Sequence, residues 1–284
     1  PDGLWHGVGA FDAQSGRQSA ASGTTPGKAV SAALLELAEK DERIYAITPA
    51  MTTGAHLTEF AKKYPKRFID AGIAEEHALV LANALAFSGM KPFVTIYSTF
   101  LQRGYDQINH DIARMGGAVV VGIDRCGVIG EDGVSHQGIF DVSLLLPLPG
   151  ITLAQGKDAA ESARLLATGF TMDSPFLLRY SKNTVPEQPL SMEPLPVGRW
   201  ERLYEGEVTV ITYGDFVGEA QEARRMLSLD GIEMGLVNAR FLKPFDEEMM
   251  TELLAEGKLL LVYEEVAAIG GLGSLLQQFA VEQE

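Results

Sequence analysis

Residues 67–97 read RFIDAGIAEEHALVLANALAFSGMKPFVTIY, and this stretch decides the fold. Its two ends, 67–70 and 92–97, are short runs of apolar and β-branched residues, which are typical of strands. Between them, 75–87 is apolar on nearly every side, which predicts a buried helix. A helix that joins two strands is the unit from which parallel sheets are built, so we expect an α/β protein.

The same alternation continues on both sides of this unit. Apolar residues at helical spacing predict the flanking helices, and short apolar runs predict the flanking strands. The expected helices are 29–39, 56–63, 102–113 and 159–169, and the expected strands are 43–47, 118–123, 151–154 and 176–180. Together these elements predict a mostly parallel sheet flanked by helices.

A proline-rich segment over 184–200 predicts the boundary between two domains, because proline fits neither a helix interior nor a central strand. We therefore expect a flexible lead-in over 1–27, a first domain over 28–183, a linker, and a smaller three-layered α/β domain over 201–284. The elements expected in this second domain are strands 208–213, 233–238 and 258–263 and helices 218–227, 247–255 and 274–281.

Composition narrows the class of protein. The chain has 284 residues and a formal net charge of −15, which argues against nucleic acid and anionic membranes as partners. Its single cysteine, Cys126, excludes an internal disulfide, and its five histidines show no metal-ligand spacing. No apolar run reaches the roughly 20 residues of a membrane-spanning helix. We expect a protein of a reducing compartment, the cytoplasm, or the plastid if the source is a plant or alga.

Ligands of parallel sheets gather beyond the carboxyl ends of the strands, so polar residues at those positions are candidates. Glu75 begins the central helix, where it is either an ordinary partner for the helix dipole or a carboxylate held in an apolar pocket to share a proton with a ligand. Arg103, Arg125 and Arg179 follow three different strands. Each alone fits a surface salt bridge, whereas together they predict a clamp for a carboxylate or phosphate.

The glycine-rich loop over 127–138 carries two further candidates. His136 is either a proton donor or a solvated loop histidine, and Asp132 either orients it or fixes the turn. Cys126 is expected to be a packed small residue. The glycine turn over 270–273 lies where a dinucleotide-binding loop would be, but its spacing favours a tight turn that packs a helix on the sheet.

Four motifs in order along the chain carry a family resemblance. They are AITPAM (46–51), GIAEEHA (72–78), IYSTFLQR (96–103) and GVSHQGIFD (133–141). These motifs resemble the 1-deoxy-D-xylulose-5-phosphate synthases, which are transketolase-like thiamine diphosphate enzymes. The similarity covers nearly the whole chain, from WHGV (5–8) to GGLGS (270–274).

The resemblance implies a pyrimidine-binding domain followed by a transketolase C-terminal-type domain that is expected to be truncated. It also implies condensation of pyruvate with D-glyceraldehyde 3-phosphate to 1-deoxy-D-xylulose 5-phosphate and CO₂. The cofactors would be thiamine diphosphate and Mg²⁺. The metal ligands are expected outside this chain, on a pyrophosphate-binding domain or subunit, so we expect the chain alone to be inactive. The family further implies a homodimer.

The resemblance also implies roles for individual residues. Glu75 would bond the aminopyrimidine ring of thiamine, Phe100 would pack on that ring, and Arg103 would lie near the pyruvate-derived group. Tyr97, Arg125 and Arg179 would hold the phosphate of the aldehyde substrate. Polar residues around the reacting carbons would be His6, Asp132 and His136.

Two departures from the family pattern stand near these residues. Glu76 occupies a position where the family usually has glutamine, and RYSKN over 179–183 replaces an Arg-Tyr-Pro-basic-Gly pattern. Two other interpretations stay open: a β-type subunit of a 2-oxo acid dehydrogenase or split transketolase, and a non-catalytic transketolase-like subunit.

Overall fold

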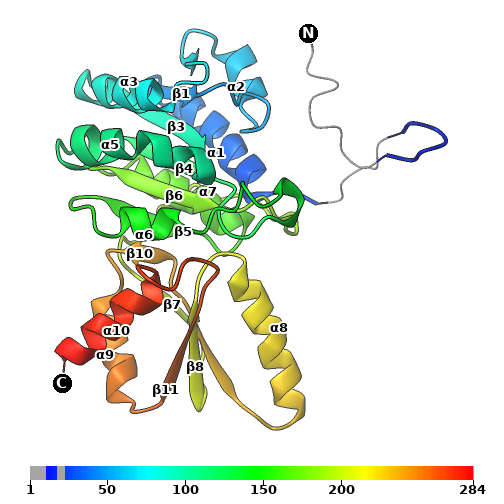
Figure 1. Ribbon diagram of the computed structural model, residues 1–284, viewed down its shortest axis with the longest axis vertical. Helices are drawn as coiled ribbons and strands as arrows, with labels where there is room; N and C mark the ends of the chain where they lie inside the picture. The colour runs from blue at the N-terminus through cyan, green and yellow to red at the C-terminus, as the bar shows by residue number, and fades with distance from the viewer. Residues whose placement is uncertain (1–10, 18–22, 284) are drawn as a thin grey trace.

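The computed structural model describes residues 11–17 and 23–283 and places their strands in two sheets (Figure 1). The larger sheet has the order β10-β5-β6-β4-β3-β1-β2, and the smaller has the order β11-β8-β9-β7. In Figure 1 the larger sheet with its helices forms the upper half of the molecule and the smaller sheet forms the lower half. This is the α/β architecture that the alternating pattern predicted.

Six strands of the larger sheet run parallel. They are β1 (Ile44–Thr48), β2 (Phe68–Asp70), β3 (Lys91–Tyr97), β4 (Val120–Asp124), β5 (Thr152–Gln155) and β6 (Phe176–Tyr180). Strands β3, β4, β5 and β6 are buried almost throughout, as expected for a sheet covered on both faces. Each predicted strand lies within one or two residues of an observed one.

Helices cover both faces of this sheet. One face carries α1 (Pro26–Lys40), α2 (Thr58–Lys63) and α7 (Ala159–Gly169), and the other carries α3 (Glu75–Phe87) and α6 (Asp141–Leu145) (Figure 1). The helix expected over 102–113 begins earlier and is irregular: it comprises α4 (Ser98–Leu101), η1 (Gln102–Gly104), α5 (Tyr105–Gln107) and the π-helical η2 (Ile108–Ala113). The short helix α6 was not predicted.

The prediction that α3 is buried holds for one face only. Its buried residues include Ala78, Leu79 and Ala82, whereas Val80 is 44% and Phe87 58% exposed. Apolar residues on the outer face of α3 are therefore exposed to solvent in this chain. Periodicity could not show this, because it reports the polarity of a helix face and not what covers it.

The smaller sheet comprises β7 (Glu201–Tyr204), β8 (Val208–Thr212), β9 (Met234–Asn238) and β11 (Leu259–Tyr263). Helix α8 (Phe216–Leu229) covers one face, where Val217 packs with Val210 and Leu236. Helices α9 (Glu247–Ala255) and α10 (Leu272–Glu282) cover the other. The expected three-layered arrangement is confirmed, and β7 is an additional antiparallel strand.

Strand β10 (Phe241–Lys243) was not predicted and joins the two sheets. Although it follows β9 in sequence, it pairs antiparallel with β5 at the edge of the larger sheet. Phe241 is fully buried there, and Trp200 donates a hydrogen bond from Nε1 to the Phe241 carbonyl at 2.8 Å. Three residues are too short a run to be recognised as a strand from sequence.

The segment over 184–200 contains no helix and no regular strand, as its prolines predicted. It is nevertheless packed, because Leu195 is buried and its N–H donates to Thr168 Oγ1 of α7 at 2.8 Å. Of the expected lead-in over 1–27, residues 1–10 and 18–22 lie outside the described part of the chain, and Thr24 forms a β-bridge with Val185.

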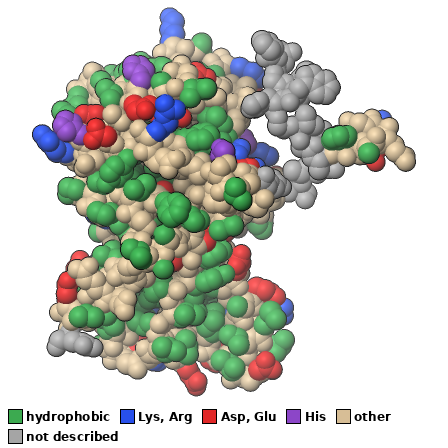
Figure 2. Space-filling model, in the orientation of Figure 1, with side chains coloured by type: hydrophobic (Ala, Val, Ile, Leu, Met, Phe, Trp, Pro, Cys, Tyr) green, Lys and Arg blue, Asp and Glu red, His purple; other side chains and the backbone are tan. Residues whose placement is uncertain are grey.

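Surface charge differs between the two halves on the face shown in Figure 2. Acidic side chains lie along the rim of the lower half, and most basic side chains gather on the upper half. None of the described helices is both long and apolar enough to cross a lipid bilayer.

Candidate active site

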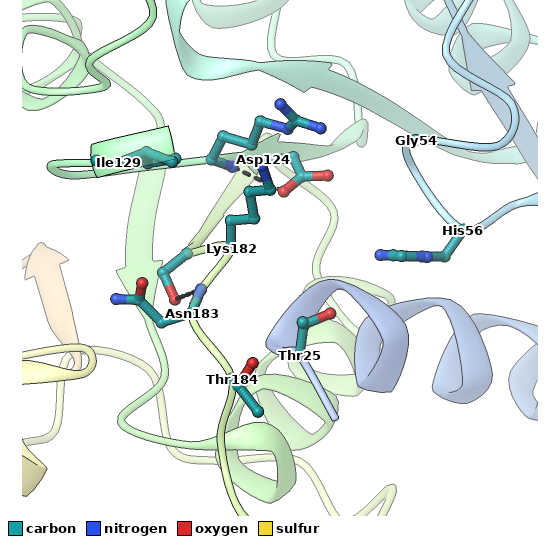
Figure 3. Close-up of a pocket in the computed structure, with 11 residues that line it drawn as sticks. Thr25, Gly54, His56, Asp124, Ile129, Lys182, Asn183 and Thr184 are labelled. Atoms are coloured by element: carbon teal, nitrogen blue, oxygen red, sulfur yellow. Dashed lines mark hydrogen bonds between the residues drawn. The ribbon is translucent and has the colours of Figure 1, made fainter. Parts of the chain in front are cut away.

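A cavity of about 550 Å³ opens at the carboxyl ends of β1, β4 and β6 (Figure 3). This is the edge of a parallel sheet at which ligands gather. The residues that line the cavity are Thr25, Gly54, His56, Asp124, Arg125, Ile129, Gly130, Ser181, Lys182, Asn183 and Thr184. The cavity therefore combines cationic, carboxylate and imidazole groups from four separate segments.

Glu75 lies at the first position of α3 and is only 3% exposed. Its Oε2 atom is buried without a hydrogen-bond partner among the described residues, and Arg103 Nη1 lies 3.4 Å from it. The Nε atom of Arg103 also donates to Glu76 Oε1 at 3.3 Å. A buried carboxylate oxygen that lacks a donor is costly unless a ligand supplies one, so Glu75 is equipped to accept a hydrogen bond from a bound group.

Three aromatic rings connect β3, α4 and the glycine-rich loop. Phe100 stacks on Tyr97 with ring centroids 5.6 Å apart, and the His136 ring meets Phe100 edge-on at 5.4 Å. The guanidinium of Arg125 lies 4.1 Å from the centre of the Tyr97 ring. The fold thus brings four predicted site residues together in one contiguous group.

The hydroxyl of Tyr97 is buried and has no hydrogen-bond partner among the described residues, and burial raises its pKa to about 12. It stays protonated at neutral pH and can donate to an oxygen of a ligand. A Cβ atom added to Gly54 would lie 2.2 Å from this hydroxyl oxygen. Glycine is therefore required at position 54 for the Tyr97 side chain to keep its place.

Asp132 links the loop to the cationic side of the cavity. Its carboxylate accepts from Arg125 Nη1 at 2.6 Å and from Lys182 Nζ at 2.9 Å. The expectation that Asp132 orients His136 is not supported, since the Nδ1 atom of His136 instead lies 2.8 Å from Ser135 Oγ. Asp132 therefore positions the side chains of Arg125 and Lys182 rather than that of His136.

The loop that carries these residues is closed by its own hydrogen bonds. Gly127 and Gly138 exchange two backbone bonds of 2.8 Å, and the Gln137 side chain bonds the backbone of Ile129 and Gly133. Its glycines would by themselves allow a flexible loop. The structure shows a braced loop instead.

Arg179 does not join the other two arginines. Its side chain is 1% exposed and forms an ion pair with Asp141, with Nε donating at 2.9 Å and Nη2 at 3.0 Å. Gln155 accepts from its third nitrogen, Nη1. The three-arginine clamp is therefore not assembled, because Arg103, Arg125 and Arg179 each pair with their own carboxylate. A substrate-binding role for Arg179 stays a prediction that this geometry does not support.

Several groups that line the cavity were not among the site residues predicted from the sequence. Burial raises the pKa of Asp124 to about 7, and its Oδ1 accepts from the Arg125 N–H at 2.7 Å. Lys182 lies within the RYSKN segment, and Figure 3 shows it reaching toward Asp124. His56 follows β1, and its ring points into the cavity from the opposite side. The position after a strand was an available signal for Lys182 and Asp124, but the contact of His56 depends on tertiary structure.

Three other expectations concern the remaining candidates. His6 lies outside the described residues, so its predicted role stays a prediction. Within residues 11–17 and 23–283, no three His, Cys, Asp or Glu side chains gather as a metal site requires. Cys126 is buried, and its Sγ donates to Asp141 at 3.3 Å, which confirms a packed residue.

The glycine turn before α10 is also as expected. Glu264 accepts the N–H groups of Leu272 and Gly273 at 3.0 and 2.9 Å. A carboxylate of the chain itself thus occupies the helix N-terminus, where a dinucleotide phosphate would bind. The turn packs a helix on its sheet and forms no nucleotide site.

A sequence model described as the transketolase pyrimidine binding domain matches residues 23–188, and a second, described as the transketolase C-terminal domain, matches residues 198–284. The chain belongs to the transketolase pyrimidine-binding domain family. This membership confirms the resemblance indicated by the four motifs and the two kinds of domain that it implied.

The relatives of this transketolase-family chain agree with the motifs. It is 43% identical over 283 residues to the 1-deoxy-D-xylulose-5-phosphate synthase of Listeria monocytogenes, covering 98% of this chain and 46% of the relative. It is also 43% identical over 286 residues to the synthase of Bacillus mycoides, covering 99% and 45%. The chain thus spans about half the length of the curated relatives it matches.

Solved structures show the same fold. A split gene transketolase, described as an inactive β4 tetramer, superposes with a TM-score of 0.82 at 29% identity, covering 93% of this chain and 86% of that one. A transketolase from Pichia stipitis superposes with a TM-score of 0.77 at 19% identity, covering 88% and 40%. The second likeness concerns the fold alone.

Proposed function

We propose that this chain supplies the pyrimidine-side and substrate-side residues of a thiamine diphosphate-dependent transferase. The reaction would condense pyruvate with D-glyceraldehyde 3-phosphate to give 1-deoxy-D-xylulose 5-phosphate and CO₂. The observation that carries the proposal is the buried Oε2 atom of Glu75, which accepts no hydrogen bond among the described residues, in a family member that is 43% identical to synthases of this name.

The residues present fit thiamine diphosphate. When bound, this cofactor supplies a carbanion that adds to a 2-oxo acid and stabilises the charge left by decarboxylation. Glu75 would hold a proton at the ring nitrogen of the aminopyrimidine, because its orphaned oxygen requires a donor. Phe100 lies half-buried between Tyr97 and His136 and would pack on the same ring.

The substrates would lie on either side of this aromatic group. Arg103 would bind near the pyruvate-derived group, since half of its side chain is exposed beside Glu75. Arg125 and Lys182 would bind the phosphate of the aldehyde in the 550 Å³ cavity, because a guanidinium and an ammonium there face a common space. Tyr97 and His136 would donate hydrogen bonds to substrate oxygens.

The remaining expectations belong to the same proposal. Mg²⁺ and the diphosphate would be held by a pyrophosphate-binding domain or subunit, and the active enzyme would be a homodimer in the cytoplasm. The family relationship and the partial coverage of the relatives support a need for that further segment.

Reconstitution tests the proposed function. The 284-residue chain, with thiamine diphosphate, Mg²⁺ and both substrates, is expected to give no product on its own. Addition of the pyrophosphate-binding segment of a relative, fused or in trans, is expected to restore formation of 1-deoxy-D-xylulose 5-phosphate, detected by mass spectrometry. Turnover by the chain alone would contradict the need for that segment, and absence of product with it would contradict the reaction.

A second candidate is a subunit of a split transketolase. The observation that favours it is the 86% coverage of the split gene transketolase chain, compared with 46% of the Listeria synthase. The same reconstitution separates the two. Transfer of a two-carbon ketol group from a ketose phosphate, without consumption of pyruvate, would identify the split transketolase. No turnover of either kind would identify a non-catalytic subunit.

A further inference from the structure

His56 extends into the cavity from the loop between β1 and α2. It is half-buried, and a Cβ atom added to Gly27, at the start of α1, would lie 3.4 Å from its Cδ2 atom. Its backbone carbonyl accepts a hydrogen bond from Ser31 Oγ at 2.6 Å. Figure 3 shows the imidazole directed across the cavity toward Asp124 and Lys182. Helix α1 thus holds the backbone of His56, and the ring is directed at the space where a ligand would lie.

The backbone at His56 adopts a conformation that side chains rarely take. Among the described residues, three non-glycine residues have a left-handed φ of 58°: Ala50, His56 and Arg125. Two of the three, His56 and Arg125, line the same cavity. Such conformations cost free energy, and they cluster at sites where a side chain must be placed for function.

The charges that shift the titration of His56 are cationic, although the Asp132 carboxylate pairs with both Arg125 and Lys182. Burial lowers the pKa of its imidazole, and the positive charges of Lys28 on α1 and of Arg125 after β4 lower it further. The other ionisable groups that line the cavity are Asp124 on β4 and Lys182 after β6. An imidazole in this setting is neutral at neutral pH while the cavity holds no anion.

We propose that His56 is a third contact for the anionic group of the substrate, beside Arg125 and Lys182, and that it takes up a proton from solvent when a dianion binds. The inference rests on the proposed function and assigns a residue to the recognition of its phosphate. A protonated imidazole donates charge-assisted hydrogen bonds to an anion from both ring nitrogens. A neutral imidazole has a single N–H donor and no charge, so it binds an anion more weakly. The ligand class is a doubly charged oxyanion, such as a phosphate ester.

The sign of the pH dependence follows from this coupling. A dianion between Arg125 and His56 offsets the positive field, which raises the pKa of the imidazole toward or above its ordinary value. Anion affinity therefore rises as pH falls from 8 to 6. Asp124, with its pKa near 7, loses its negative charge over the same range and also strengthens anion binding, so its contribution must be separated.

Sulfate is the probe that isolates the protein's own titration. Phosphate monoesters change charge near pH 6, whereas sulfate stays doubly charged over the whole range. Sulfate binding would be measured by calorimetry at pH 6 and pH 8 for the Asp124→Asn variant and for Asp124→Asn/His56→Gln. The first variant is expected to bind several-fold more tightly at pH 6 than at pH 8, with the tenfold effect of one unit of pKa shift as the upper limit. For the second variant, the ratio of the sulfate affinities at pH 6 and pH 8 is expected to be near one.

A spectroscopic readout follows His56 directly. Its ring-proton resonance, assigned by its loss in His56→Gln, is expected to titrate about one pKa unit higher at saturating sulfate than without sulfate. His110→Gln is the matched control, because His110 is exposed on η2 and bonds Asp111 away from the cavity. His110→Gln is expected to leave the ratio of the sulfate affinities at pH 6 and pH 8 unchanged.

Three results would overturn the inference. They are no sulfate binding, a His56 pKa that sulfate does not change, or the same ratio of sulfate affinities at pH 6 and pH 8 with and without His56. None of these measurements requires thiamine diphosphate or turnover. A failed reconstitution with a normal His56 response would therefore refute the proposed function alone. Normal synthase turnover with an unresponsive His56 would refute this inference alone.

Discussion

Glu75 shows how one residue type at one position supports two interpretations until its surroundings are known. A carboxylate in the first turn of a helix is common because it interacts favourably with the helix dipole, and it is then usually solvated. Glu75 is instead almost fully buried, with one oxygen lacking a hydrogen-bond donor, while the adjacent Glu76 is 41% exposed at its side chain. The proposed binding role of Glu75 rests on this contrast between the two neighbours.

Replacement of Glu75 by glutamine tests that role in the reconstituted enzyme. Glutamine keeps the size of the side chain but cannot hold the proton at a cofactor nitrogen, so turnover is expected to fall by roughly 10²–10⁴-fold. The melting temperature is expected to change little. Glu76→Gln removes the same charge one residue away and is expected to keep most of the turnover. Near-normal turnover in Glu75→Gln would refute the proton-holding role.

Gly54 makes a second prediction at the residue scale. Gly54→Ala would place a methyl group 2.2 Å from the Tyr97 hydroxyl and 2.9 Å from the Met51 methyl group. Overpacking of this kind costs about 1–3 kcal/mol of unfolding free energy, measured by urea denaturation. Gly130→Ala is the control from the same cavity, because its Cβ would meet no atom within 4 Å. Equal stability of the two variants would contradict the tight contact.

At the scale of elements, the loop over 127–138 is held by the second half of the chain as well as by its own bonds. Glu265, just after β11, accepts from the Val128 N–H at 3.0 Å, and the Ala267 N–H donates to the Ile139 carbonyl at 2.9 Å. Burial raises the pKa of Glu265. The smaller sheet therefore fixes the base of a loop whose tip carries Asp132 and His136.

Substitution of Glu265 tests this support. Glu265→Ala removes the acceptor and is expected to speed amide hydrogen exchange at Val128 by roughly tenfold, the effect of about 1.4 kcal/mol. Glu265→Gln keeps a carbonyl oxygen as acceptor and is expected to retain most of the protection. Val128 exchange would be followed by NMR. Equal Val128 exchange rates in the wild type and in Glu265→Ala would show that the hydrogen bonds within the loop are sufficient to hold it in place.

At the scale of the whole molecule, β10 connects the two sheets, because it follows β9 of the smaller sheet and pairs with β5 of the larger one. Phe241 is fully buried, and the ammonium of Lys243 donates to the carbonyls of Leu146 and Leu148, at the end of α6 and just beyond it. The Arg179–Asp141 pair lies near Tyr213, which directly follows β8 of the smaller sheet, with 5.9 Å between the Arg179 guanidinium and the ring centre. Apolar packing, hydrogen bonds and a cation–π contact therefore cross the boundary together.

Thermal unfolding is expected to be a single transition as a result. Phe241→Ala is expected to lower the unfolding free energy by about 3–5 kcal/mol, the usual cost of removing a buried phenylalanine ring. Both sheets should lose stability together, seen as one calorimetric peak shifted to lower temperature. Leu259→Ala on β11 is the control, because Leu259 is 68% exposed. Two separate peaks would contradict a single cooperative unit.

The sequence by itself determined most of the elements and the family. Helical and strand periodicity over 67–97 located β2, α3 and β3 to within one or two residues, since local side-chain polarity reports which face is buried. The motifs over 72–78, 96–103 and 133–141 were enough to indicate a transketolase-type enzyme. Candidate residues at strand ends, such as Arg125 and Tyr97, lie together because parallel topology brings those ends to one edge.

Only the tertiary structure decided which candidates share a site. It separated Arg179 from Arg125 by giving each its own carboxylate, and it placed β10, which follows β9 in sequence, at the edge of the larger sheet. It also brought His56 into the cavity. These outcomes depend on contacts between residues far apart in sequence. A local pattern carries the polarity of a residue, but not the identity of the group that it will meet.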